Sequence, residues 1–415
     1  MSHLRSDRGG NAKLTDQTDV HRLLRRFEEG SLLRPSAASP NIVDLSRALA
    51  HVAGADTVDL TPTARKLAAL IGDPDHLIFI LADGLGMNLV ERLPRDNILA
   101  AAVVDELRTV FPSTSSVALT SLATGTWPNL HGVTGQWTHL PEAEAAAGLL
   151  QFATRAGGRS LASLGITVSQ AFPIPSVYAA LRRDTIALFP DNLVNSVSSA
   201  YFTGERVRGG YRALTDAVDF LVDRIARACE PTYSYLYAPQ IDLEAHYHGV
   251  FHPMVGTAIA ELSRQVERLA RSLNGRSRIV ITADHGLLDT PVTARHYLRP
   301  SAGLFEALRF PPSGDSRVLY LHVRDGAADR VRAWFHHHYG SRFLVISTDE
   351  AERLELFGPG PLSSHTRARL GDLIVISTGT DVIEYAPGKV DRFAALVSHH
   401  SGLTPSEMRV PFIVI

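Results

Sequence analysis

The stretch His76-Leu-Ile-Phe-Ile-Leu-Ala82 is a short, mainly apolar run that ends in Asp83-Gly-Leu-Gly86. An apolar run of this length, without alternation, is typical of a strand buried on both faces of a parallel sheet. Such sheets bind ligands at the carboxyl ends of their strands, which is where Asp83 lies. A structural cap of the helix expected from about Met87 is the alternative role for this carboxylate. The glycines are not a nucleotide-binding fingerprint, because the third glycine is missing.

A second buried strand is predicted at Arg278-Ile-Val-Ile-Thr-Ala283, and it ends in Asp284-His285-Gly286. Adjacent side chains on a strand point to opposite faces, so Asp284 and His285 cannot both face one way within it. At a turn after the strand, however, they can approach one ion from two sides. We therefore expect a ligand site at this strand end as well.

A third strand is expected at 232–238, which is rich in aromatic residues, and Pro239-Gln-Ile-Asp242-Leu-Glu-Ala-His246 follows it. Asp242 and His246 are four residues apart, so one helical turn places both on the same face. That spacing suits two ligands of one metal ion. A surface turn with a capping aspartate and a solvated histidine is the alternative.

The chain also contains Phe111-Pro-Ser-Thr-Ser-Ser-Val-Ala-Leu-Thr-Ser-Leu-Ala-Thr-Gly125. Four hydroxyls in a row, 113–116, precede a helical run of small residues that Gly125 can end. Free N–H groups and a positive dipole at a helix start favour an oxyanion, although a plain N-cap is the alternative. An alcohol needs a base or a metal ion to become a good nucleophile.

Composition is that of an ordinary soluble protein of 415 residues, with 45% hydrophobic and 20% charged residues. A net charge of −2 gives no reason to expect binding to nucleic acid or to an anionic membrane. The single cysteine, Cys229, excludes an internal disulfide. We see no signal peptide and no run near the ~20 apolar residues of a transmembrane helix, so we expect a cytoplasmic protein.

The length fits one large domain with insertions. We expect a flexible N-terminal segment at 1–40 and a catalytic domain at 41–415, with insertions at about 137–205 and 291–370. A helix is expected at 100–107. Strands are expected at 371–377, in the main core, and in the apolar run that ends at Ile415.

Together these strand ends and the histidines near the C-terminus would supply three carboxylates, three imidazoles and one alcohol to one edge of one sheet. Mixed nitrogen and oxygen ligands suit zinc. Two divalent ions about 4 Å apart can clamp the attacking and leaving oxygens of an in-line displacement. Two such ions and three aspartates would leave a net charge of +1, which attracts an anionic phosphoryl group.

In their order along the chain, these pieces resemble the alkaline phosphatase superfamily, and within it the type I phosphodiesterase/nucleotide pyrophosphatase family. The most specific pieces are Ala283-Asp-His-Gly286 and Ser398-His-His-Ser-Gly-Leu-Thr-Pro-Ser-Glu-Met-Arg-Val-Pro411. The resemblance covers about residues 75–415. It implies an α/β fold, a three-layer sandwich with a largely parallel central sheet and a smaller inserted cap.

The resemblance also implies roles for individual residues. One zinc ion would be held by Asp242, His246 and His400, and the other by Asp83, Asp284 and His285. The nucleophile, held by the second ion, falls on Ser115, with Thr114 as the fallback. His400 fits better than His399, because it immediately precedes Ser-Gly-Leu-Thr-Pro.

The implied activity is that of a zinc-dependent phosphodiesterase or nucleotide pyrophosphatase, which hydrolyses a small phosphate ester, nucleotides included, through a covalent phosphoserine. Two departures affect specificity: serine stands where threonine is common, and Ala118 replaces the asparagine that contacts a phosphate oxygen in the diesterases. A phosphomonoesterase of the same superfamily and a non-catalytic binding protein are the alternatives. A sulfatase motif (Cys/Ser-x-Pro-x-Arg) and a G-x-S-x-G elbow are both missing.

Overall fold

The computed structural model describes residues 18–56, 58–273, 275–385 and 396–415. Its centre is a seven-stranded sheet in which five neighbouring strands are parallel and β18 is antiparallel to both of its neighbours. Across the sheet the order is β2 (Val103–Arg108), β18 (Arg409–Val414), β9 (Ser277–Thr282), β1 (His76–Ala82), β8 (Thr232–Ala238), β6 (Asp184–Pro190) and β7 (Val207–Tyr211). The α/β fold with a largely parallel sheet is thus confirmed.

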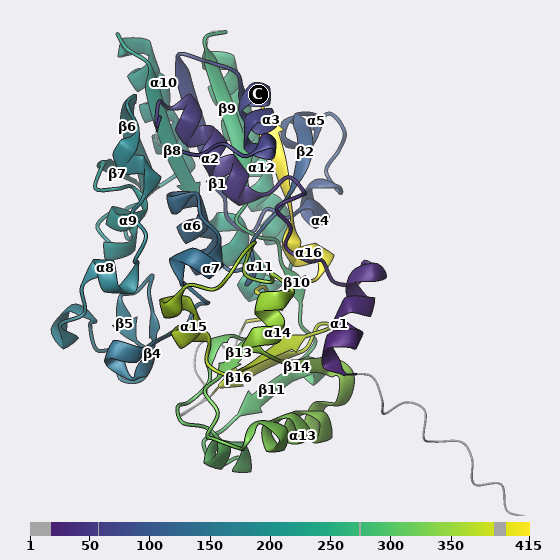
Figure 1. Ribbon diagram of the computed structural model, residues 1–415. Helices are drawn as coiled ribbons and strands as arrows, with labels where there is room; N and C mark the ends of the chain where they lie inside the picture. Colours follow the sequence, from purple (N-terminus) through teal and green to yellow (C-terminus); the bar gives the residue numbers. More distant parts are fainter. Residues whose placement is uncertain (1–17, 57, 274, 386–395) are drawn as a thin grey trace, which may run out of the picture.

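Helices cover both faces of this sheet. From β7 to β8 and again from β8 to β9, the chain moves across the sheet in the same direction, toward β2. Because such crossovers are right-handed, the helices of both connections lie on the same face of the sheet. These are α10 (Leu214–Arg227), α11 (Gln240–His248) and α12 (Pro253–Ser272). The other face carries α2 (Ile42–Val52), α3 (Pro62–Ile71) and α6 (Ser115–Thr124), of which α2 and α3 lie in front in Figure 1.

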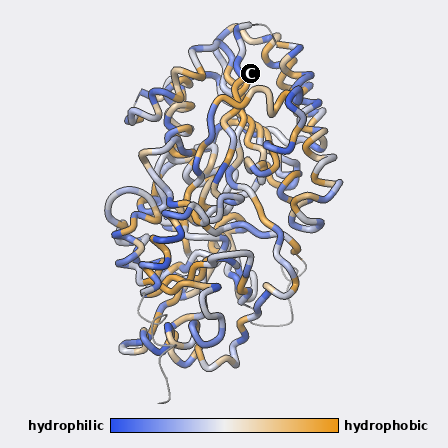
Figure 2. The backbone as a smooth tube through the Cα atoms, turned by 90° about the vertical axis from the view of Figure 1, so that its right-hand side faces the viewer, coloured by the Kyte–Doolittle hydropathy of each residue, from blue (hydrophilic) through white to orange (hydrophobic). Residues whose placement is uncertain are grey.

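A second, antiparallel sheet lies below the first in Figure 1. Its order is β12 (Ser313–Asp315), β13 (Val318–Leu321), β15 (Leu373–Ser377) and β14 (Phe343–Ser347). Alternate residues enter two separate apolar clusters: Leu344 and Ile346 pack toward α1 (Asp19–Glu28), whereas Phe343 and Val345 pack toward α13 (Ala328–Tyr339). Both faces of the sheet are therefore apolar, and Figure 2 shows hydrophobic strands inside both layers.

Smaller elements connect these layers. The remaining strands are β3 (Thr138–Leu140), β4 (Ala145–Gly148), β5 (Ala153–Thr154), β10 (Leu288–Asp289), β11 (Arg295–Leu298), β16 (Val382–Tyr385) and β17 (Ser398–His399). The remaining α-helices are α4 (Met87–Val90), α5 (Ile98–Ala101), α7 (Pro128–His131), α8 (Val168–Ala171), α9 (Val197–Phe202), α14 (Thr348–Arg353), α15 (Ser364–Leu370) and α16 (Pro405–Met408). Among the described residues, no helix combines the length and apolar character that a membrane span requires.

Three expectations from the sequence need correction. The helix expected at 100–107 ends at Ala101, because 103–108 pairs with β18 as the edge strand β2. The strand at 373–377 lies in the second sheet and not in the main core. The stretch 137–205 is not wholly an insertion, since it contains β6 of the central sheet. In each case pairing between segments distant in the chain decided the outcome, and local pattern does not contain that information.

The N-terminal segment is only partly within the described residues. Residues 1–17 lie outside them. From Thr18 on, α1 packs on the second sheet: Leu23 is fully buried, and the Asp19 carboxylate accepts hydrogen bonds from Val345 N and from the His336 ring. The cluster His336-His-His338 therefore includes a side chain that joins α13 to α1.

A buried ion pair links the second sheet to the C-terminal segment. Arg317 and Glu407 are both fully buried, with Arg317 Nε donating to Glu407 Oε1 at 2.6 Å. Glu407 also accepts from Gly402 N, and it forms a capping box with Thr404 at the start of α16. The Gly-Leu-Thr-Pro-Ser-Glu sequence is thus a structural device that fixes the loop after His400.

Glu407→Ala should lower the free energy of unfolding by about 3–5 kcal/mol, because it leaves the Arg317 charge buried without its partner. Urea denaturation followed by circular dichroism measures this loss. The control is Glu91→Ala, which removes a partner of Arg409 at the surface and should cost about 1 kcal/mol or less. Equal losses in the two variants would contradict the assigned role of the buried pair.

Candidate active site

Main-chain pairing brings three of the predicted strand ends together. β1 pairs in parallel with β8 and β9, and Ala82 lies opposite Ala238 in the register. Asp83 N donates to Ala238 O at 3.0 Å, and Asp242 N donates to Asp83 O at 3.1 Å. The carboxyl ends of the three strands, and the residues after them, therefore meet at one edge of the sheet.

A fully buried group forms where β1 and β9 end. Asp83, Asp284 and His285 place their ligand atoms within 4.8 Å of one another. His285 Nε2 lies 3.6 Å from Asp83 Oδ1 and 3.4 Å from Asp284 Oδ2. The turn after β9 accordingly lets neighbouring aspartate and histidine residues converge.

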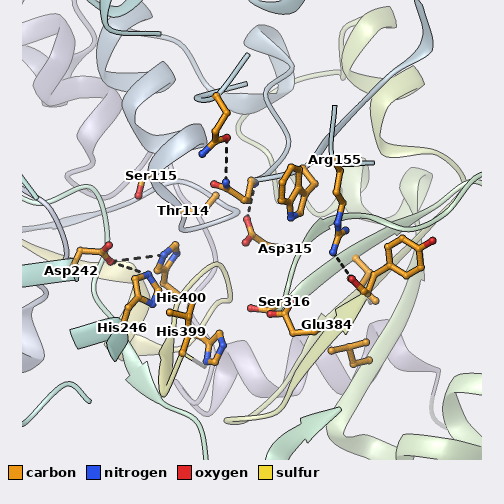
Figure 3. A pocket seen from close by; sticks show the side chains of 17 residues that line it. Thr114, Ser115, Arg155, Asp242, His246, Asp315, Ser316, Glu384, His399 and His400 are labelled. Atoms are coloured by element: carbon orange, nitrogen blue, oxygen red, sulfur yellow. Dashed lines mark hydrogen bonds and ion pairs between the residues drawn. The ribbon is translucent and has the colours of Figure 1, made fainter. Parts of the chain in front are cut away.

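A second group lies at the cavity surface and consists of one aspartate and two histidines. Asp242 and His246 share a face of α11, and His400 approaches them from the C-terminal segment (Figure 3). Asp242 Oδ1 is 3.3 Å from His246 Nε2 and 3.9 Å from His400 Nε2. All three side chains are partly exposed, and all three line a cavity of about 210 Å³.

The two groups adjoin, and Ser115 lies beside them. The rings of His285 and His400, one from each group, stack with centroids 3.8 Å apart. Ser115 Oγ is 3.1 Å from His285 Nε2. Because α6 begins at Ser115, the positive end of its dipole lies at this hydroxyl.

Main-chain carbonyls orient the three imidazoles. Nδ1 of His285, His246 and His400 lies 3.1, 2.8 and 3.1 Å from the carbonyl oxygens of Gly286, Ser398 and Ser113, respectively. A carbonyl can only accept, so each Nδ1 carries the proton and donates it. Each Nε2 then presents a lone pair toward its own group, as metal-binding histidines do.

The donor atoms fit bound cations. Asp83 Oδ1, Asp242 Oδ1 and Asp284 Oδ2 are buried and lack a hydrogen-bond partner among the described residues. Burial, and then the charges of Asp284 and Asp242, raise the pKa of Asp83 well above its usual value. Burial, and then His285 and His246, lower the pKa of His400 well below its usual value. Neutral imidazoles and crowded carboxylates are what divalent ions need as ligands.

The four consecutive hydroxyls have different surroundings. Ser113 Oγ donates to Gly402 O, and Ser116 Oγ is buried without a partner among the described residues. Thr114 lies beside Asp315, and its hydroxyl is one of the groups that lower the pKa of that carboxyl. Only Ser115 directs its hydroxyl at the buried Asp/His group, so the geometry favours Ser115 over Thr114.

The structure thus brings all seven predicted residues together at one edge of the sheet: Ser115, Asp242, His246 and His400 line the cavity, and the buried group of Asp83, Asp284 and His285 adjoins them. His399 also lines that cavity, but its Nδ1 lies 2.9 Å from Thr290 Oγ1, and it belongs to neither Asp/His group. Sequence reasoning missed Tyr237, whose hydroxyl donates to Asp83 Oδ2. It also missed Asp315 and Arg155 in the cavity wall, because no motif marks them and neither follows a strand predicted from the sequence.

Comparison with known proteins shows the family. Residues 77–400 match the model of the type I phosphodiesterase / nucleotide pyrophosphatase family. The chain belongs to this family. It is therefore a member of a family of phosphoric ester hydrolases within the alkaline phosphatase superfamily. No curated protein sequence matches it.

Solved structures show the same fold at low sequence identity. Human ectonucleotide pyrophosphatase/phosphodiesterase 5 aligns with a TM-score of 0.59 and 16% identity, over 81% of this chain and 87% of that one. The murine protein gives a TM-score of 0.58 and 17% identity, with the same coverage of both chains, and an inactive variant of it was solved with AMP. Phosphonoacetate hydrolase from Sinorhizobium meliloti 1021, solved with phosphonoacetate, gives 0.58 and 16%, over 82% and 90%.

Tyr237 orients a carboxylate of the buried group. Burial, and then the charge of Asp83, raise the pKa of Tyr237 well above its usual value, so the hydroxyl stays protonated and donates. If Asp83, Asp284 and His285 hold a divalent ion, Tyr237→Phe should therefore weaken its binding about 10- to 100-fold. Competition with a chromophoric chelator measures this change.

The matched control is Tyr233→Phe on the same strand, whose hydroxyl bonds to Tyr178 and not to a site residue. It should leave metal affinity unchanged. Equal affinities of the Tyr237 variant and the wild type would show that Asp83 is oriented without this hydrogen bond.

Proposed function

We propose that this chain is a zinc-dependent phosphodiesterase or nucleotide pyrophosphatase that acts through a covalent phosphoserine at Ser115. The observation that carries the proposal is the position of Ser115 Oγ, which contacts the buried Asp/His group and lines the same cavity as the adjoining second group. Asp83, Asp284 and His285 would hold one ion, and Asp242, His246 and His400 the other. Bound there, two divalent cations would neutralise charge on the phosphoryl group and on the two oxygens exchanged at phosphorus.

The residues themselves supply position and polarity. Ser115 Oγ, as the alkoxide, forms a bond to phosphorus while the bond from phosphorus to the leaving oxygen breaks. Water then displaces Ser115 Oγ from phosphorus, which regenerates the serine and releases the phosphate product. Positioning and charge stabilisation account for most of the catalysis of phosphoryl transfer. The N-terminus of α6 lies where negative charge on the phosphoryl oxygens would be stabilised.

The substrate is proposed to be a small phosphate ester. Nucleotides are included because a structural neighbour, the murine phosphodiesterase, was solved with AMP. The net charge of the loaded site supports an anionic substrate, since two divalent cations and three aspartates sum to +1. Turnover of thymidine-5′-p-nitrophenyl phosphate, bis-p-nitrophenyl phosphate and p-nitrophenyl phosphate by the zinc-loaded protein tests the substrate class.

Ser115→Ala should lower turnover of the diester at least about 1,000-fold, because it removes the nucleophile and leaves both Asp/His groups in place. The control, Ser116→Ala, removes a neighbouring buried hydroxyl and should retain activity within a few-fold. Mass spectrometry of acid-quenched wild type should find the phosphoryl group on Ser115. A Ser115 variant with wild-type turnover would exclude this residue as nucleophile and direct attention to Thr114.

Metal analysis of gently purified protein should find about two divalent ions per chain. Removal by EDTA should abolish turnover and lower the melting temperature, because an ion that binds only the folded state stabilises it. Asp242→Asn should reduce the metal content toward one ion per chain, since it removes a ligand only from the group that contains His246 and His400. Protein that is active with no bound metal would refute the proposed metal dependence.

A further inference from the structure

Asp315 stands in the wall of the catalytic cavity beside the nucleophile loop. It is the last residue of β12, and it lines the same cavity as Ser115, Asp242 and His400. Figure 3 shows its carboxyl next to Thr114, across the cavity from Asp242 and His400. A phosphoryl group on Ser115 would therefore have this carboxyl among its neighbours.

The position of Asp315 is fixed by its surroundings. Asp315 Oδ2 accepts from Gln136 N at 2.9 Å, and its carboxyl also interacts with the Thr114 hydroxyl. Two main-chain hydrogen bonds, of 3.0 and 2.7 Å, join Trp137 to the preceding residue, Gly314. Gly314 has a φ of +98°, and a Cβ there would lie 2.4 Å from Val318 O, so only glycine fits this close turn.

Burial raises the pKa of Asp315 to about 6, and the hydrogen bonds from Gln136 N and the Thr114 hydroxyl are the main interactions that lower it. At about pH 8 the carboxyl is therefore ionised, and its partly exposed side chain presents the charge to the cavity. Such a charge acts strongly on other charges within a few ångströms.

One cation of the cavity lining, Arg155, acts on this carboxylate: its charge lowers the pKa of Asp315, but less than the hydrogen bonds from Gln136 N and the Thr114 hydroxyl do. Among the described lining residues, Arg155 is the only arginine or lysine. Its guanidinium lies 5.0 Å from the ring centres of both Trp137 and Tyr385, and it donates to Tyr385 O at 2.8 Å. Figure 3 shows Arg155 on the side of the cavity away from Ser115.

We propose that Asp315 is a specificity-determining residue that selects a phosphoryl group with a single negative charge, as in a phosphodiester, over the dianion of a phosphomonoester. This inference rests on the proposed function and narrows its substrate class. A monoester carries one more negative charge on the phosphoryl oxygens, which the Asp315 carboxylate repels. A diester replaces that charge with a neutral ester oxygen, and the repulsion is reduced.

The test compares Asp315→Asn with the wild type. The amide keeps the shape of the side chain and an acceptor for Gln136 N, but removes the charge. At about pH 8, the ratio of kcat/KM for p-nitrophenyl phosphate to that for bis-p-nitrophenyl phosphate should rise about 10- to 100-fold. Inhibition by inorganic phosphate, which is mainly a dianion at that pH, should strengthen by a similar factor.

Three variants complete the design, with metal content and circular dichroism measured for each. Asp315→Ala removes the charge without placing an amide against Thr114, and should shift the ratio in the same direction. Asp315→Glu keeps the charge and should stay near the wild-type ratio. Glu384→Gln removes a carboxylate that Figure 3 places farther from Ser115 in the same cavity, and should change the ratio less.

A ratio that stays within about 3-fold of wild type in folded, metal-loaded Asp315→Asn would overturn the inference. An equal fall for both substrates would also overturn it, because that result indicates a structural role. The inference would also be overturned if the wild type strongly preferred p-nitrophenyl phosphate over bis-p-nitrophenyl phosphate. Absence of all ester turnover by metal-loaded wild type would overturn the proposed function as well, so the two failures are distinguishable.

Discussion

Negative charge buried at the carboxyl ends of β1 and β9 is the constraint on which the site depends. The main-chain ladder of a parallel sheet sets where Asp83 and Asp284 lie, and both side chains are almost completely shielded from water. Two carboxylates in such a place repel each other and lose their hydration. The Tyr237 hydroxyl and the N–H groups of Gly84 and His285 satisfy some of their oxygens, but not Asp83 Oδ1 or Asp284 Oδ2. A bound cation would supply the compensation that the described protein groups do not.

The same constraint explains why distant segments converge here. A single strand end offers too few donors for a divalent ion, so α11 and the C-terminal segment must approach the same edge. Their approach is fixed by main-chain contacts: Ser113 O orients His400, and Ser398 O orients His246. The loop that carries Ser115 thus helps to position His400, a member of the cavity-surface Asp/His group. The proposed nucleophile and the proposed metal ligands are therefore parts of one hydrogen-bonded unit.

The sequence predicted the part of this unit that local pattern determines. Apolar runs located the strands of the parallel core, and polar residues immediately after them located Asp83, Asp284 and His285. The i, i+4 spacing placed Asp242 and His246 on one helical face. Tertiary pairing determined the rest. The stretch 100–107 looks helical in isolation, because Ala, Leu and Glu favour helix, but pairing with β18 makes 103–108 an edge strand. Asp315 ends a three-residue strand that no motif marks, so its place in the cavity depends on the packing of two sheets.

That packing gives the hairpin of β12 and β13 two functions at once. Asp315, at the end of β12, lines the cavity, whereas Arg317, two residues later, pairs with Glu407, which also accepts a hydrogen bond from Gly402 N in the loop after His400. The turn between the strands therefore connects the wall of the cavity to the support of a proposed metal ligand. A substitution that moved this hairpin, and with it Asp315 in the cavity wall, would also disturb His400. Substitution of the Asp315 side chain alone avoids that coupling, because the backbone pairing of Gly314 and the Arg317–Glu407 ion pair hold the hairpin independently of its charge.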